Sequence, residues 1–327
     1  MGCSDKLKKV VRELFEGFPI ALELLRTELF QEKSKRDPFR GLFDCCEIQK
    51  GTDMKLEKED YMDPQCVLCG KPGGEEAVTP IPAGRVMDKL REYEDRNDWP
   101  GVERHLKYWL AEAEAGRDER GQLMLNNELM GYYRKQGRRE EAFAYADRAA
   151  ELVEKLEMAD TVTAGTTWVN IGTVKEAFGD PVNGLAFFER ARENYEKNLP
   201  EGDERLGGLY NNMALALSVC GRYDEAMERF SRAIEVMKKQ EYGELEQAIT
   251  WLNMADATEA ALGTEQAEES VEEYLDRAEE LLNTENLPRN GYYAFVCEKC
   301  APVFGHYGYF ATEAELKRRA AEIHDRA

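Results

Sequence analysis

The sequence has no long hydrophobic run. The apolar stretch from Phe18 to Leu25 contains Glu23 and is followed by Arg26, so it falls well short of the about 20 apolar residues of a membrane-spanning helix. The first residues also lack the apolar core of a secretory signal peptide. These absences predict a cytoplasmic protein that has no membrane as a partner.

Positive charge is also scarce in this chain of 327 residues. The chain contains 44 Lys and Arg residues and 65 Asp and Glu residues, which gives a formal net charge of -21 at pH 7. Such an acidic field repels the phosphates of nucleic acids. We therefore expect no nucleic-acid partner.

Recognisable catalytic motifs are missing as well. The sequence contains no G-x-S-x-G, no H-E-x-x-H and no phosphate-binding loop. Its only histidines are His105, His306 and His324, and each of them fits a position on a helix or at the surface. The sequence therefore predicts a protein that is not an enzyme.

What the chain does contain is a period of 42 residues, marked by glycines. The recurring glycines are Gly137, Gly179, Gly221 and Gly263. Small or large apolar residues follow the first three at offsets of five, nine and twelve: Ala142, Ala146 and Ala149; Gly184, Phe188 and Ala191; Ala226, Phe230 and Ala233. These offsets fall on one stripe of a helix, and the small residues let a neighbouring helix come close.

The segment before each glycine repeats too. Trp168 and Tyr210 lie eleven residues before their glycines, and Gly172 and Ala214 lie seven before. Each unit is therefore expected to be a helix, a glycine turn and a second helix. Stacking of such units predicts an all-α solenoid.

Two segments carry a specific resemblance, namely "WVNIGTVKEAFGDPVNGLAFFERAR" and "YNNMALALSVCGRYDEAMERFSRAI". They resemble the tetratricopeptide repeat family, and the 42-residue length is most similar to repeats of the kinesin-light-chain type. Lys175 and Leu217 stand where the family usually has tyrosine. The resemblance implies a right-handed superhelical solenoid of about six helix–turn–helix units over residues 84–327, with a turn at Asn97 in the first unit and at Gly308 in the last.

Residues 1–83 differ from the rest and are expected to form a separate N-terminal segment. Its first part reads as one or two amphipathic helices, and the remainder is irregular and contains cysteines. Cys66 and Cys69 have the spacing of a zinc knuckle, and Cys45 and Cys46 are the nearest candidates for completing the site. Free, partly exposed thiols are the alternative interpretation.

A second cysteine pair, Cys297 and Cys300, occupies the positions that Trp168 and Ile171 fill in an earlier unit. This register predicts that both thiols are core residues rather than metal ligands. The surrounding run is rich in aromatic residues and is expected to be the packed end of the solenoid. An exposed part of it would offer a contact for a homodimer.

Asparagines recur nine or ten residues before the turn glycines. They are Asn127, Asn170, Asn211, Asn212 and Asn253. In the resembling families, asparagines at this place face the concave groove and hold the backbone of an extended peptide, since one amide offers a donor and an acceptor. The alternative is that each asparagine bonds within its own helix pair.

Arg134 belongs to a basic spot together with Lys135, Arg138 and Arg139. This spot favours an acidic peptide or a terminal carboxylate as the ligand, although a solvated helix end explains it equally well. The sequence thus predicts a non-enzymatic scaffold that binds a protein or peptide in its groove. The alternative function is a zinc- or thiol-dependent sensor that uses the N-terminal cysteines.

The zinc prediction can be tested by elemental analysis. Reduced protein purified without added zinc is expected to hold about one equivalent of zinc, because structural sites bind the metal tightly. Less than about a tenth of an equivalent would rule out the site at Cys66 and Cys69.

Overall fold

The computed structural model describes residues 78–325, and these residues form helices joined by short turns, without a strand in that range. The helices are α3 (Ala83–Asp95), α4 (Trp99–Ala115), α5 (Glu119–Lys135), α6 (Arg139–Lys155), α7 (Val162–Ala177), α8 (Pro181–Asn198), α9 (Glu204–Val219), α10 (Tyr223–Met237), α11 (Glu244–Leu262), α12 (Thr264–Leu282), α13 (Gly291–His306) and α14 (Phe310–His324). None of these helices is long and apolar enough to cross a membrane. The all-α prediction is confirmed.

The turn within each helix pair depends on a residue in the left-handed backbone region. These residues are Asn97 (φ 53°), Gly137 (φ 66°), Gly179 (φ 83°), Gly221 (φ 74°), Gly263 (φ 81°) and Gly308 (φ 85°). Glycine adopts this conformation without a steric penalty, and asparagine tolerates it better than most residues. Six turns and six helix pairs confirm the predicted number of units in the part of the chain that the structure describes.

Close packing within each pair depends on the predicted small residues. In α10, Ala226 and Phe230 are completely buried and Ala233 is nearly so. In the preceding pair, a Cβ atom added to Gly172 would lie 2.5 Å from Cε1 of Phe188. The small residue on one helix therefore leaves the space that the aromatic ring of the other helix fills.

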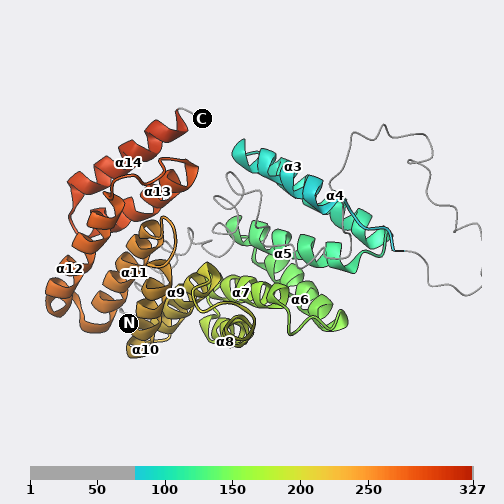
Figure 1. Ribbon diagram of the computed structural model, residues 1–327, viewed down its shortest axis with the longest axis horizontal. Helices are drawn as coiled ribbons and strands as arrows, with labels where there is room; N and C mark the ends of the chain where they lie inside the picture. The colour runs from blue at the N-terminus through green and yellow to red at the C-terminus, as the bar shows by residue number, and fades with distance from the viewer. Residues whose placement is uncertain (1–77, 326–327) are drawn as a thin grey trace, which may run out of the picture.

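The six pairs stack into an arch (Figure 1). Helices α5, α7, α9, α11 and α13 lie on its inner side, and α6, α8, α10 and α12 lie outside. Neighbouring inner helices contact one another from α5 through to α13. The inner face is therefore built from the first helix of the second to the sixth unit.

The hydrophobic core consists of two clusters that meet at α11. One cluster extends from Ile81 to α10 and includes Met254 and Ala257, whereas the other contains Leu245 and continues to Ala320. Trp251 and Tyr274 pack against both clusters, with their ring centroids 5.4 Å apart. Helix α11 therefore contributes to both parts of the core.

The predicted core role of the second cysteine pair is confirmed. Cys297 and Cys300 in α13 are at most 1% exposed. Burial raises the pKa of the Cys297 thiol to about 11, so the thiol stays protonated at neutral pH. Both cysteines act as small apolar residues in the last helix pair.

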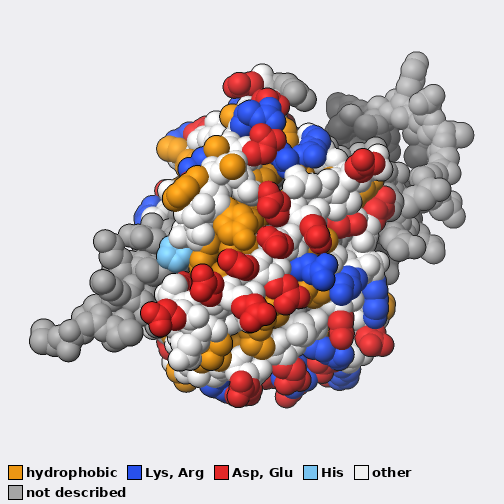
Figure 2. Space-filling view, turned by 90° about the vertical axis from the view of Figure 1, so that its left-hand side faces the viewer, with side chains coloured by type: hydrophobic (Ala, Val, Ile, Leu, Met, Phe, Trp, Pro, Cys, Tyr) orange, Lys and Arg blue, Asp and Glu red, His pale blue; other side chains and the backbone are white. Residues whose placement is uncertain are grey.

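Acidic side chains dominate one side of the arch. Figure 2 shows many of them, with apolar side chains in between, on the side that lies at the left of Figure 1, where α12 runs. The sequence of α12 contains eight acidic residues and a single basic one, Arg277. This side therefore contributes strongly to the negative field of the protein.

The packing of the small residues predicts a large cost for Ala226→Leu. Ala226 is completely buried, so the added atoms must displace close-packed neighbours, and we expect a loss of about 1–3 kcal/mol in the free energy of unfolding. Ala260→Leu is the matched control, because Ala260 is exposed near the end of α11. Chemical denaturation of both variants measures the difference, and an unchanged stability of Ala226→Leu would contradict the predicted register.

Candidate functional site

The recurring asparagines join the inner helices of neighbouring units. Asn170 on α7 donates a hydrogen bond from Nδ2 to Oδ1 of Asn127 on α5, at 2.9 Å. Asn253 on α11 likewise donates from Nδ2 to Oδ1 of Asn211 on α9, at 3.0 Å. Neither bond lies within one helix pair, so the asparagines connect units rather than the two helices of a unit.

The series is interrupted between α7 and α9. Val169 occupies the position, ten residues before the turn glycine, that Asn127 and Asn211 occupy in their units. The next asparagine, Asn212, has a buried Nδ2 without a hydrogen-bond partner. The missing acceptor at Val169 explains why this amide nitrogen stays unbonded.

Most of these amides are covered. Asn170, Asn211, Asn212 and Asn253 are 3–5% exposed, whereas Asn127 is partly exposed. Three of the covered amides still have an atom without a hydrogen-bond partner: Oδ1 of Asn170, Nδ2 of Asn211 and Nδ2 of Asn212. The inner face therefore holds oriented amide groups with unused hydrogen-bonding capacity. Their predicted contact with a partner remains a prediction.

Arg134 and Glu176 occupy equivalent positions on α5 and α7, each three residues before its turn glycine. Both side chains are buried. Burial raises the pKa of the Glu176 carboxyl to about 8, an effect that outweighs the opposing positive charge of Arg134. At pH 7 this carboxyl is therefore mostly protonated, and the Arg134–Glu176 pair is positively charged.

The other members of the predicted basic spot have partners of their own. Arg138 bonds to Glu141 through Nε at 2.8 Å and lies 3.2 Å from Glu103 on α4. Arg139 donates from Nη1 to the carbonyl oxygen of Phe178 at 2.9 Å. These two arginines thus hold helices together.

The predicted zinc ligands Cys45, Cys46, Cys66 and Cys69 lie outside the described residues. Within residues 78–325, no group of three or more His, Cys, Asp or Glu side chains is placed to hold a metal ion. The zinc site therefore remains a prediction about residues 1–83.

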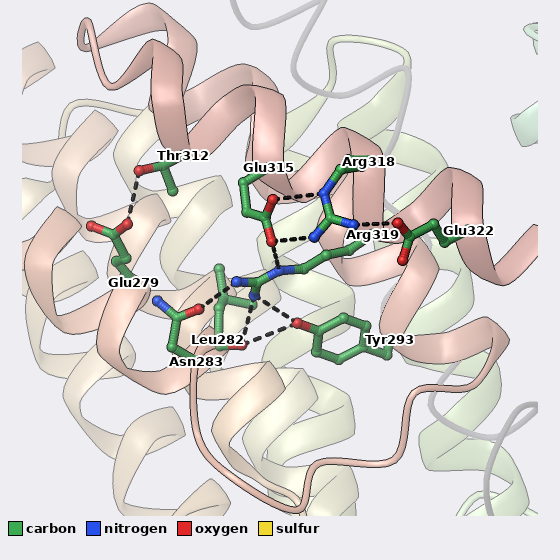
Figure 3. Close-up of polar contacts among 9 residues, drawn as sticks. All are labelled: Glu279, Leu282, Asn283, Tyr293, Thr312, Glu315, Arg318, Arg319 and Glu322. Carbon is green, nitrogen blue, oxygen red and sulfur yellow. Dashed lines mark hydrogen bonds and ion pairs between the residues drawn. The ribbon is translucent and has the colours of Figure 1, made fainter.

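Sequence reasoning missed a polar cluster in the last two helix pairs (Figure 3). Arg319 on α14 donates to Oδ1 of Asn283 at 2.7 Å and to the hydroxyl of Tyr293 at 2.9 Å. Its Nε donates to Glu315 at 2.8 Å, and the hydroxyl of Tyr293 donates to the carbonyl oxygen of Leu282 at 3.1 Å. Arg319 thereby ties α14 to the end of α12 and the start of α13.

A cavity of about 340 Å³ lies beside this cluster. It is lined by Arg289, Glu315, Arg318, Arg319, Glu322 and Ile323. In the sequence, the only indication of this cavity is the pair of adjacent arginines at 318 and 319, which is flanked by glutamates. Arg289 is far from them in the sequence, so the pattern gave no reason to group it with them.

The comparisons with known proteins agree with this architecture. A family model described as "Tetratricopeptide repeat" matches residues 122–197, which correspond to α5 to α8. This chain contains a tetratricopeptide-repeat solenoid. Its 42-residue units and inner helices are the features that the sequence predicted for this kind of repeat.

Among solved structures, the solenoid is similar to the crystal structure of BtubC (BKLC) from P. vanneervenii. The TM-score is 0.54 at 16% sequence identity, over 64% of this chain and 84% of that chain. Kinesin light chain TPR-like repeats from Podosopora anserina match with a TM-score of 0.45 at 16% identity, over 63% of this chain and 96% of that chain. No curated protein sequence matches this chain. At this identity, the similarity to BtubC concerns the fold alone.

The bonds between units predict unequal effects for two asparagine substitutions. Asn253→Ala removes the donor to Asn211 and leaves a buried acceptor unsatisfied, so we expect a loss of about 1–3 kcal/mol in the free energy of unfolding. Asn212→Ala removes an amide nitrogen that has no partner, and we expect a smaller loss. Urea denaturation measures both, and an equal or larger loss in Asn212→Ala would contradict the pairing.

Proposed function

We propose that this protein is a non-enzymatic cytoplasmic scaffold that binds an extended peptide, or an extended segment of a protein, along its inner face. Tetratricopeptide repeats generally mediate interactions between proteins, which supports the broad class of function. The observation that carries the finer proposal is the row of asparagine amides on successive inner helices, with hydrogen-bonding atoms left unused.

The chemistry of the amide suits the backbone of a peptide. Each asparagine offers a donor and an acceptor, as each peptide unit does. The bonds Asn127–Asn170 and Asn211–Asn253 already fix the orientation of four amides, so little side-chain entropy is lost when a partner binds. Asn127 is the partly exposed member of the row, so a peptide backbone can reach its amide directly. The unused atoms of Asn170, Asn211 and Asn212 are buried, so contact with them requires the neighbouring side chains to move apart.

The local positive charge at Arg134 supports the proposal that the partner carries an acidic side chain. Because the raised pKa of Glu176 leaves this carboxyl mostly protonated at pH 7, the Arg134–Glu176 pair is positively charged there. A carboxylate approaching Arg134 would form a charge-assisted hydrogen bond, which is stronger than a neutral one. The partner is therefore expected to combine an extended backbone with an acidic residue.

The test compares an inner-face variant with an outer-face variant. A partner found by pull-down from native cytosol is titrated against the wild type and against the triple variant Asn170→Ala, Asn212→Ala, Asn253→Ala. Each lost hydrogen bond is expected to weaken binding from a few-fold to about tenfold. Asn183→Ala is the matched control, because Asn183 is exposed on the outer helix α8 and bonds only to Asp180.

The titrations are carried out at a temperature at which every variant is fully folded, since Asn253→Ala is expected to lower stability. The proposal predicts weaker binding of the triple variant and unchanged binding of Asn183→Ala. If the triple variant melts at a lower temperature yet binds the partner normally in the cold, the asparagines have a structural role only and the inner-face site is wrong.

A further inference from the structure

The cavity beside α14 differs in charge from the rest of the molecule. Its ionic lining consists of three arginines and two glutamates, in a chain whose net charge is -21. The volume of about 340 Å³ accommodates a side chain or a chain end rather than a folded domain. A small anion is therefore the class of ligand to consider.

Both glutamates of the cavity are already neutralised by arginine. Glu315 bonds to Arg318 at 2.7 Å and to Arg319 at 2.8 Å, and Glu322 pairs with Arg318 (Figure 3). These arginines lower the pKa of Glu315 to about 2, so its carboxylate stays charged and engaged. The remaining arginine of the lining, Arg289, carries the excess positive charge.

Among residues 78–325, Arg289 forms no ion pair and no hydrogen bond, although the charge of Glu315 is near enough to raise its pKa. Its guanidinium carbon lies 4.1 Å from the centroid of the Tyr293 ring. This cation–π contact is not a hydrogen bond, so the N–H groups of the guanidinium remain for a ligand. Partial burial and the positive charge of Arg319 lower the pKa of Arg289 below its ordinary value. The fold thus holds two like charges near each other.

The platform under Arg289 is fixed by hydrogen bonds. The hydroxyl of Tyr293 donates to the carbonyl oxygen of Leu282 and accepts from Arg319. Tyr293 is itself completely buried in the core. A ring held in this way gives the stacked guanidinium a defined position, which reduces the entropy lost when a ligand binds.

We propose that Arg289, which lines this cavity and lies over the Tyr293 ring, binds a single carboxylate group of a peptide. One guanidinium edge matches one carboxylate with two parallel hydrogen bonds. The ionic lining has an excess of one positive charge, which a carboxylate neutralises, whereas the dianionic form of phosphate would be repelled by Glu315 and Glu322. The site shares no residue with the inner-face asparagines and does not depend on the proposed function.

The experiment uses the full chain at low ionic strength, because screening by salt weakens such a contact. Binding is followed by NMR through the side-chain Nε–Hε signals of the arginines. Two probes separate the sources of the carboxylate: acetyl-Gly-Asp-Gly-amide presents a side chain, and acetyl-Gly-Gly-Ala presents a free chain end. Acetyl-Gly-Gly-Ala-amide is the neutral control, and inorganic phosphate tests the competing anion.

We expect at least one carboxylate probe to shift the Arg289 signal in a saturable way, and the neutral probe to leave it unchanged. Arg289→Ala is expected to weaken this probe at least about tenfold, and Arg289→Lys to weaken it less. The matched control is Arg277→Ala, which removes one positive charge from exposed α12. It should bind like the wild type.

Three results would overturn the site. The first is saturable binding of phosphate without binding of either carboxylate probe, and the second is no saturable binding of either carboxylate probe. The third is an equal loss of affinity in Arg277→Ala and Arg289→Ala, which would mean that only the overall charge matters. Melting curves of the variants establish that each one is folded during the titration. None of these results bears on binding at the inner face.

Discussion

The close approach of the two helices within each pair is the constraint on which the rest of the structure depends. A glycine or asparagine with positive φ reverses the chain, and small residues then let an aromatic ring of the partner helix fill the gap, as at Gly172 and Phe188. With this distance fixed, the first helices of successive pairs come into contact along the inner side of the arch. The hydrogen bonds between asparagines of neighbouring units are possible only because these helices lie so close.

Much of this fold could be predicted because its cause is local and periodic. The turn at Gly221, the buried stripe from Ala226 to Ala233 and the core position of Cys297 all follow from fixed offsets along the chain. The partners of the asparagines could not be predicted in the same way. Whether Asn170 contacts Asn127 depends on how one unit is rotated relative to the next. The spacing of residues within one unit gives no information about that rotation.

The polar cluster of the last pairs shows a second limit of sequence reasoning. Arg289 precedes α13 and Arg319 lies in α14, so only the packing of these elements brings them to one cavity. The raised pKa of Glu176 has a similar origin, because it depends on the burial of the carboxyl. Both features depend on which side chains surround a residue in the folded protein. A repeat pattern predicts only whether a position is buried or exposed.

The division of the core at α11 has a consequence for how cooperatively the chain unfolds. In a linear array each unit is stabilised mainly by its neighbours, so the weakest boundary decides where the cooperative transition separates. Here Trp251 and Tyr274 form much of the apolar connection between the two clusters. We therefore expect the C-terminal pairs and the rest of the solenoid to behave as two cooperative units joined at α11, so that a local opening there releases one while the other stays native.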